Sequence, residues 1–232
     1  MSGHIGIAAV SPEGAALFYQ SLTRQLGRVA EGRGGGWPRI TMHNEPFGHY
    51  LEALRDRDWM RVGALLRRSA ERLAGCGAAF CLSPDNAVQH GIHVAEVGSP
   101  IPWITMPELV ADSLVGIGCR RVGIIGTKMV TTGSTYQTTL GMRGIQVEVP
   151  GTDEVEALDA IIFGELIYGE RRPQSQATVL KIVANLASRG CEGVILGCSE
   201  APLVVTPENS PLPVFDAAEI LAAGAVERAI SS

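Results

Sequence analysis

Two side chains that can accept or donate a proton follow short apolar segments of the sequence. Cys198 comes near the end of GVILGCSE, and Asp85 follows AAFCLSP. A thiol (usual pKa about 8.5) is a much stronger base when ionised than a carboxylate (about 3.9). The segment after Cys198 can begin a helix, whose exposed N–H groups would lower the pKa of the thiol. The pair predicts proton transfer, with Cys198 as the principal acid or base.

Each of these side chains also has an ordinary structural interpretation. A cysteine after a buried strand is more often a core residue than a catalyst. The short carboxylate of Asp85 is suited to capping a helix. The functional interpretation therefore depends on how the two segments are related in the fold.

Apolar runs of strand length alternate with stretches of helical period along the chain. The first series pairs 4–10 with 14–29, 40–43 with 58–74, and 78–83 with 86–97. The second runs through 121–126, 133–141, 145–149, 155–168, 175–187, 193–197, 212–214 and 217–229. This alternation predicts an α/β fold with mostly parallel sheets.

The two series also resemble one another. GHIGIAAVSPEG is similar to RRVGIIGTKMVTTG, and GCGAAFCLSPDNA to GCEGVILGCSEAP. Ser11 precedes Asp85 by nearly the same distance along the chain as Thr127 precedes Cys198. We interpret this as an internal repeat of two pseudo-symmetric, doubly wound lobes. Ligands of such sheets bind beyond the carboxyl ends of the strands, so we expect these four loops to face one cleft between the lobes.

Prolines indicate where the first lobe ends. Pro100, Pro102 and Pro107 interrupt any regular element in VGSPIPWITMPELV, and the last helix is expected to return to the first lobe. The predicted lobes are 1–103 plus 213–232, and 104–212. The glycine-rich segment EGRGGGW predicts a loop between elements.

Composition excludes several classes of protein. A net charge of −5 provides no positive field for nucleic acid, and no window reaches the length of a membrane span. The N-terminus has no secretory pattern, so we expect a cytoplasmic protein. The five cysteines lack disulfide or zinc spacing, and Cys76, Cys119 and Cys191 are expected to pack as small apolar residues. Without a metal-ligand cluster or a Gly-x-Gly-x-x-Gly segment, we expect no metal and no cofactor.

Four segments carry a resemblance to a known family over nearly the whole chain: IGIAAVSPEGAALFY, SPDNAVQH, VGIIGTKMVTTGSTY and VILGCSEAP. The sequence resembles the aspartate/glutamate (and hydantoin) racemase superfamily. The last segment is the most specific, since it is similar to the family's Gly-Cys-Thr-Glu, with Ser199 for Thr. The resemblance implies two Rossmann-like lobes, a homodimer, and two cysteines acting on opposite faces of a substrate α-carbon without metal or pyridoxal phosphate.

The sequence departs from that pattern at the first cysteine. Where the family has Cys-Asn-Thr, this chain has Asp85, Asn86 and Ala87. The resemblance then implies an isomerase, a racemase or epimerase of an amino acid or related small carboxylate, with Cys198 and Asp85 as catalytic residues. The substrate-binding residues that it implies are Ser11, Asn86, Ala87, Thr127, Ser199 and Glu200.

Two other functions stay open. Cys198 alone could serve an isomerase or decarboxylase of a small dicarboxylate on the same scaffold, and two similar lobes also describe a small-molecule binding module. The substrate is not determined by the sequence. A distal carboxylate would need a basic partner, and the candidates, each also interpretable as a solvated surface charge, are Arg24, Arg55, Arg57 and Lys128.

Overall fold

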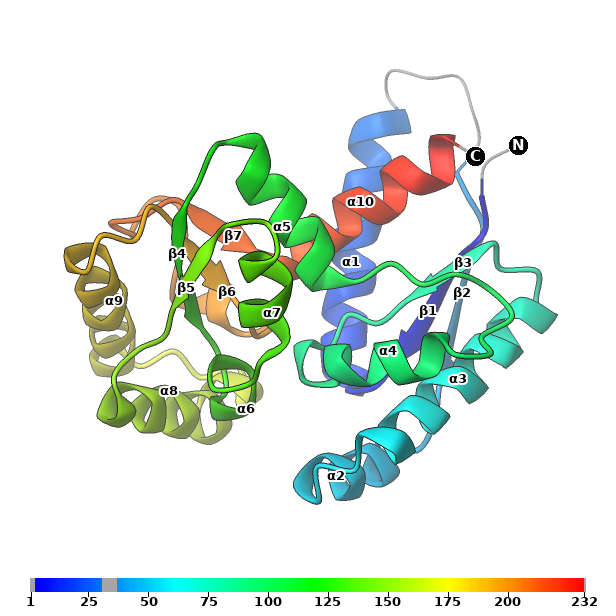
Figure 1. The fold of residues 1–232 in the computed structure, drawn as a ribbon, viewed down its shortest axis with the longest axis horizontal. Coiled ribbons are helices and arrows are strands. Elements are labelled where there is room, and N and C mark those ends of the chain that lie inside the picture. Colours follow the sequence, from blue (N-terminus) through cyan, green and yellow to red (C-terminus); the bar gives the residue numbers. More distant parts are fainter. Residues whose placement is uncertain (1–2, 31–36, 232) are drawn as a thin grey trace. The chain divides into compact units, whose positions relative to one another are not determined.

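The computed structural model describes residues 3–30 and 37–231 and confirms the predicted α/β fold with parallel sheets (Figure 1). It divides into two compact units, Met1–Leu109 with Ala218–Ser232 (unit 1) and Val110–Ala217 (unit 2). The segment EGRGGGW, predicted as a loop, lies almost wholly outside the described residues. Within the described ranges, no helix is both long and apolar enough to cross a membrane.

Unit 1 is built on a three-stranded parallel sheet of order β2-β1-β3. All five residues of β1 are buried, as expected for a parallel strand covered on both faces. The elements of this unit in chain order are β1 (Ile5–Ala9), α1 (Pro12–Ala30), β2 (Ile40–Asn44), α2 (Phe47–Arg55), α3 (Trp59–Gly75), β3 (Phe80–Leu82), the short 3-10 helix η1 (Asn86–Val88), α4 (Gln89–Glu96) and the start of α5 (Met106–Gly116).

The final helix, α10 (Ala217–Ser231), packs against α1. Ser21 Oγ donates to Glu219 Oε1 at 2.6 Å, and Gln25 Nε2 donates to Glu219 Oε2 at 2.9 Å. Hydrogen bonds to a charged group contribute more than neutral ones, about 1.5–3 kcal/mol each. These contacts fix the last helix in unit 1 (Figure 1).

Two glycines allow α3 and α4 to approach closely. A Cβ at Gly63 would lie 2.5 Å from Val94 Cβ, and one at Gly91 would lie 2.5 Å from Val62 Cγ1. Asp58 caps α3, since its Oδ1 accepts from the N–H of Arg61 at 2.9 Å. Because α4 follows directly on η1, this packing fixes the segment that carries Asp85.

Unit 2 repeats the plan with a four-stranded parallel sheet of order β5-β4-β6-β7. Its core includes the apolar faces of its two longest helices together with β6. The elements are β4 (Arg121–Ile125), α6 (Lys128–Thr131), α7 (Thr135–Gly141), β5 (Gln146–Glu148), α8 (Thr152–Gly164), the 3-10 helix η2 (Leu166–Tyr168), α9 (Pro173–Ser188), β6 (Val194–Leu196), the 3-10 helix η3 (Ala201–Leu203) and β7 (Val214–Asp216).

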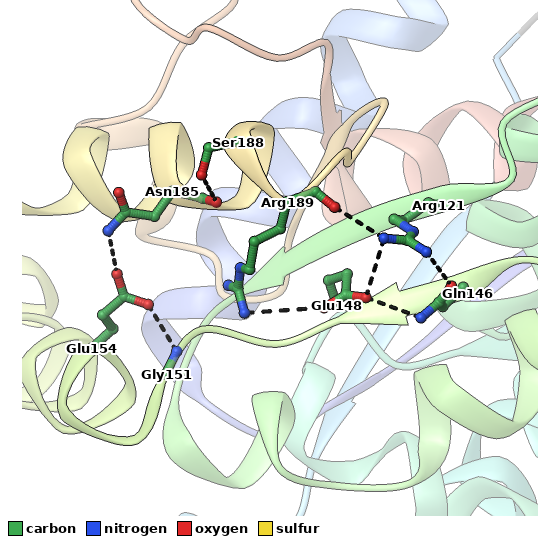
Figure 2. A network of polar contacts seen from close by, with 8 residues as sticks. All are labelled: Arg121, Gln146, Glu148, Gly151, Glu154, Asn185, Ser188 and Arg189. Carbon is green, nitrogen blue, oxygen red and sulfur yellow. Dashed lines mark hydrogen bonds and ion pairs between the residues drawn. The ribbon is translucent and has the colours of Figure 1, made fainter.

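A polar network ties the first residues of β4 and β5 to the end of α9 (Figure 2). Arg121 donates to the carbonyl of Arg189 at 2.9 Å and to Gln146 Oε1 at 2.9 Å. Glu148 lies 3.9 Å from Arg121 and 4.0 Å from Arg189. Because both arginines are substantially exposed, the ion pairs stabilise the unit by at most about 1 kcal/mol each. The network lies where β4 and β5 begin. Cys198 follows the opposite, carboxyl end of the neighbouring strand β6.

Three expectations from the sequence are wrong in detail. Helix α2 was not predicted, and Pro107 lies in the first turn of α5 instead of interrupting it. The first turn of a helix tolerates proline because its N–H has no intrahelical partner there. Cys76 is exposed as the C-cap of α3, whereas Cys119 and Cys191 are buried as expected.

Candidate active site

Cys198 lies just beyond the carboxyl end of β6 in unit 2 and is buried, with 8% of its surface exposed. The N–H of Gly197 donates to the carbonyl of Ile125 at 2.7 Å, which extends the ladder between β4 and β6. A Cβ at Gly197 would lie 3.1 Å from that carbonyl oxygen, and one at Gly126 would lie 3.0 Å from Gly197 O. The two glycines therefore allow the loops after β4 and β6 to lie close together.

The pKa of Cys198 is raised, not lowered, which corrects the expectation from the sequence. Burial raises the pKa of this thiol to about 12, and the negative charges of Glu200 and Asp216 act in the same direction. The N–H groups of Ala201 and Glu200 lower it, but η3 begins at Ala201 and spans only three residues. The helix-terminus effect is thus outweighed by burial, and Cys198 is a protonated thiol at neutral pH.

Asp85 lies beyond the carboxyl end of β3 in unit 1 and is the N-cap of η1. Its Oδ1 accepts from the N–H of Ala87 at 2.9 Å. The buried amide of Gln89 donates to the carbonyls of Ser83 and Asp85, at 2.9 and 3.0 Å, and accepts from the N–H of Met106 at 3.1 Å. Gln89 therefore holds the loop in place, a role not foreseen from the sequence, although its position four residues after Asp85 was a usable signal.

Burial also raises the pKa of Asp85. Part of the residue's surface stays exposed, and the N–H groups of Ala87 and Ser11 act in the opposite direction by stabilising the carboxylate. The structure thus brings Ser11 and Asp85 together within unit 1. The Oγ of Ser11 accepts from the N–H of Gly14 at 3.2 Å, so Ser11 caps α1 while its own N–H faces Asp85.

The strand registers show that Asp85 and Cys198 occupy matching positions in the two units. Gly6 pairs with Cys81 across β1 and β3, and Gly123 pairs with Val194 across β4 and β6. A Cβ at Gly6 would meet Leu73 of α3, and one at Gly123 would meet Leu186 of α9.

The turns before these strands match as well. Gly77 (φ 86°) follows the C-cap of α3 and Gly190 (φ 84°) follows that of α9. The same number of residues separates Leu73 from Leu186, Gly77 from Gly190, Cys81 from Val194, and Asp85 from Cys198. The repeat therefore relates the carboxylate to the thiol.

The structure changes two details of the predicted repeat. Gly77, not Gly75, corresponds to Gly190, so the predicted similarity between GCGAAFCL and GCEGVILG was shifted by two residues. When β1 is superposed on β4 by their strand registers, Thr127 corresponds to Val10, the residue before Ser11. Thr127 is nevertheless the N-cap of α6, as Ser11 is of α1, because the two loops differ by one residue.

The remaining candidate residues lie in the same loops. Asn86 and Ala87 begin η1, Ser199 and Glu200 follow Cys198, and all four are half-buried. Asp216, the last residue of β7, was not predicted from the sequence; it is paired with Leu196 of β6. The negative charge of Asp216 raises the pKa of Cys198 and of the buried Tyr136, so Asp216 contributes to the electrostatics around the thiol.

The four candidate basic residues are all exposed. Lys128 forms an ion pair with Glu156, and its backbone N–H donates to Asp159 Oδ1 at 2.7 Å. Arg24 donates to the carbonyl of Gln20 at 3.3 Å. Their exposure agrees with the interpretation as solvated surface charges.

Comparison with known proteins identifies the family. The family model for Asp/Glu/hydantoin racemases matches residues 7–225. The chain belongs to this family. A glutamate racemase from Shouchella clausii is 25% identical over 172 residues, which is 72% of this chain and 58% of that protein, so the match spans less than two thirds of the relative's length.

Solved structures share the fold. An aspartate racemase homologue from Pyrococcus horikoshii OT3 is 26% identical, with a TM-score of 0.84 covering 99% of this chain and 100% of the other. A candidate Asp/Glu racemase from Yersinia pestis is 24% identical, with a TM-score of 0.91 covering 99% and 100%. A Francisella tularensis glutamate racemase in complex with D-glutamate is 14% identical, with a TM-score of 0.69 covering 99% and 82%.

Proposed function

We propose that this protein is a racemase or epimerase of an amino acid or a related small carboxylate, with Cys198 and Asp85 as its two acid/base groups. The observation that carries the proposal is that the repeat places these two side chains at matching strand ends of two similar units. Family membership supports the class of reaction. In this proposal Asp85 replaces the first of the two cysteines that the family pattern implies.

The raised pKa of Cys198 assigns the starting protonation state of the pair. The neutral thiol is the proton donor, and the Asp85 carboxylate is the acceptor. Asp85 removes the α-proton from one face of the substrate, and Cys198 delivers its own proton to the opposite face of the resulting carbanion. The product then leaves a protonated Asp85 and a Cys198 thiolate, which is the pair that runs the reverse direction.

The forward and reverse reactions use bases of different strength. An ordinary carboxylate is a weak base for removing a proton from carbon. Burial raises the pKa of Asp85 and so makes this carboxylate a stronger base. A thiolate with a pKa near 12 is a strong base, but forming it at pH 7.5 costs roughly 6 kcal/mol. Ser11, Asn86, Ala87, Thr127, Ser199 and Glu200 bind the substrate in this proposal, and their hydroxyl, amide and backbone groups are suited to an α-carboxylate.

Two acid/base groups suffice for proton transfer at an α-carbon, so we further propose that the reaction uses neither a metal nor an organic cofactor. We propose a homodimer as the working assembly, as the family resemblance implies.

One observation favours a second candidate, a decarboxylase or isomerase of a small dicarboxylate that uses Cys198 alone. A thiol that is protonated at rest is suited to delivering a proton to an enolate, and Asp85 already has a structural task as the cap of η1. In this candidate Asp85 takes no part in proton transfer.

The test is α-proton exchange in deuterium oxide, followed by NMR over a panel of L- and D-amino acids and small dicarboxylates. A racemase exchanges the α-proton and interconverts enantiomers, and Cys198→Ala abolishes the interconversion. The matched control is Cys191→Ala, which removes a buried thiol at the other end of β6. Decarboxylation or double-bond isomerisation without α-proton exchange of any amino acid would favour the second candidate. No reaction across the panel would refute both.

A further inference from the structure

Half-buried apolar side chains gather in unit 1 near the loop of Asp85. Phe47 begins α2, Trp59 begins α3, and Ala87 lies in η1. All three are partly buried and pack against one apolar core of unit 1, whose Tyr50 is fully buried. Each of the three therefore keeps apolar surface that the core does not cover, and we call them the apolar wall.

The strand registers place Phe47 at the edge of the sheet from which the candidate site residues of unit 1 extend. The parallel strands β2, β1 and β3 all end at this edge. Phe47 follows the end of β2 by three residues, Ser11 follows that of β1 by two, and Asp85 follows that of β3 by three. The negative charge of Asp85 also raises the pKa of Tyr50, one turn after Phe47 on α2. Phe47 thus lies at the edge where ligands of such sheets bind.

The packing of α3 against α4 holds Trp59 beside the same loop. The ring centroids of Trp59 and His90 lie 4.8 Å apart, with an angle of 66° between the ring planes. His90 is the second residue of α4, which follows directly on η1. Gly63 and Gly91 allow the two helices to approach closely. The indole is therefore positioned by the packing that also fixes the segment of Asp85.

Positive charges near this edge are accompanied by carboxylates. Arg68 Nη2 lies 3.2 Å from Glu45 Oε2, and Arg61 Nη2 lies 2.7 Å from Glu52 Oε2. The exposed turn between α2 and α3 has the sequence RDRD (55–58), so its two guanidinium groups are matched by two carboxylates. Among the described residues, no arginine or lysine is buried. A distal carboxylate of a substrate would lose hydration here without gaining a dedicated cation, which is unfavourable.

Unit 2 provides an internal comparison. The separation along the chain that relates Asp85 to Cys198 also relates Ala87 to Glu200 and Trp59 to Arg172. The unit with the thiol therefore has charged side chains at two positions where the unit with the carboxylate has apolar ones. The apolar wall is a property of unit 1 and not of the repeat.

We propose that the apolar wall of Phe47, Trp59 and Ala87 binds the side chain of the substrate, so that the protein acts on α-amino acids with an apolar side chain in preference to aspartate or glutamate. This inference rests on the proposed racemase function and specifies its substrate class. An apolar side chain is stabilised when it leaves water, roughly in proportion to the apolar area that becomes buried.

The first test compares leucine with aspartate in the α-proton exchange assay. The two substrates have a similar branched shape, with methyl groups in leucine where aspartate has carboxylate oxygens. We expect kcat/KM for leucine to exceed that for aspartate by about tenfold or more, since a single methylene in an apolar pocket already changes it by about that factor. Faster turnover of aspartate would overturn the substrate class and leave the racemase function standing.

The second test uses Phe47→Ala and Trp59→Ala, with leucine and alanine as substrates. Alanine has too short a side chain to use the wall, so kcat/KM should fall by about tenfold or more for leucine and by less than about threefold for alanine. The matched controls are Leu51→Ala on α2 and Met60→Ala on α3, which alter exposed apolar side chains and should leave both values unchanged. Equal losses for leucine and alanine would show a structural role and would overturn the proposal.

A third measurement does not need turnover, so it separates failure of this inference from failure of the proposed function. Tryptophan fluorescence is followed while leucine or aspartate is added to the unmodified protein and to Trp59→Phe, which retains Trp37 and Trp103. Leucine should change the emission at about tenfold lower concentration than aspartate, and this change should be lost in Trp59→Phe. A response to leucine without α-proton exchange would support the wall and refute the racemase. A response to aspartate alone, or to neither amino acid, would overturn the wall.

Discussion

The raised pKa of Cys198 leads to a measurable loss of reactivity toward iodoacetamide. At pH 8 a thiol of pKa about 12 is ionised in about one molecule in ten thousand, against about one in ten for a thiol at the ordinary value of 9.0. The thousandfold deficit is partly offset, because a more basic thiolate is intrinsically more nucleophilic by a factor of roughly 20–30. Cys198 should therefore react about 40-fold more slowly than an ordinary exposed thiol, and burial should slow it further.

The assay is a time course of alkylation, with tandem mass spectrometry locating the label on each cysteine. Cys76, which is exposed, reports reagent access in the same molecule. The rate at Cys198 should rise nearly tenfold per pH unit above pH 8, and the difference between the two cysteines should disappear in denaturant. Labelling of Cys198 as fast as Cys76 in the folded protein at pH 8 would refute the assignment of a neutral, buried thiol.

Three further predictions concern packing, metals and the acid/base pair. Gly63→Ala should lower the free energy of unfolding by about 1–3 kcal/mol, because the added Cβ meets Val94 of α4. Gly27→Ala on α1 is the control: a Cβ there has nothing within 4 Å, so the substitution should raise the free energy of unfolding by up to about 1 kcal/mol. Thermal unfolding measures both changes. Exhaustive chelation should leave turnover unchanged, and a loss restored by zinc or magnesium would contradict this. Asp85→Cys should raise the rate of racemisation, measured by polarimetry, because two thiols form a better-matched pair; a lower rate would count against Asp85 as a base.

The order of strands and helices was largely predictable because β1, β3, β4 and β6 lie in short apolar runs, although β2 and β5 include polar residues. The two missed helices have weaker signals. Helix α2 begins after Pro46 with FGHY, which has little helical periodicity, and α5 contains Pro107, which was interpreted as a breaker. Such segments become helical because they pack on neighbouring elements, and that packing is not visible in a local pattern.

The equivalent positions of Asp85 and Cys198 in the repeat were predictable, but the electrostatics around the two side chains were not. The pairing of Asp85 with Cys198 follows from the repeat, and the strand registers support it. The direction of the Cys198 pKa shift depends on how deeply the thiol is buried and on how short η3 is. Neither property is encoded in the spacing of a motif, because both depend on how distant parts of unit 2 pack around the strand end.

The central claim, that Asp85 and Cys198 act as unequal partners on one α-carbon, is tested most directly by Asp85→Asn. The measurement compares α-proton exchange in deuterium oxide with net racemisation, both followed by NMR with a chiral shift reagent. Removing the carboxylate leaves only the minor thiolate form of Cys198 to exchange protons on its own face, so slow exchange should persist while racemisation falls much further. Full racemisation by Asp85→Asn would contradict the claim, since Asp85 would then be only the cap of η1.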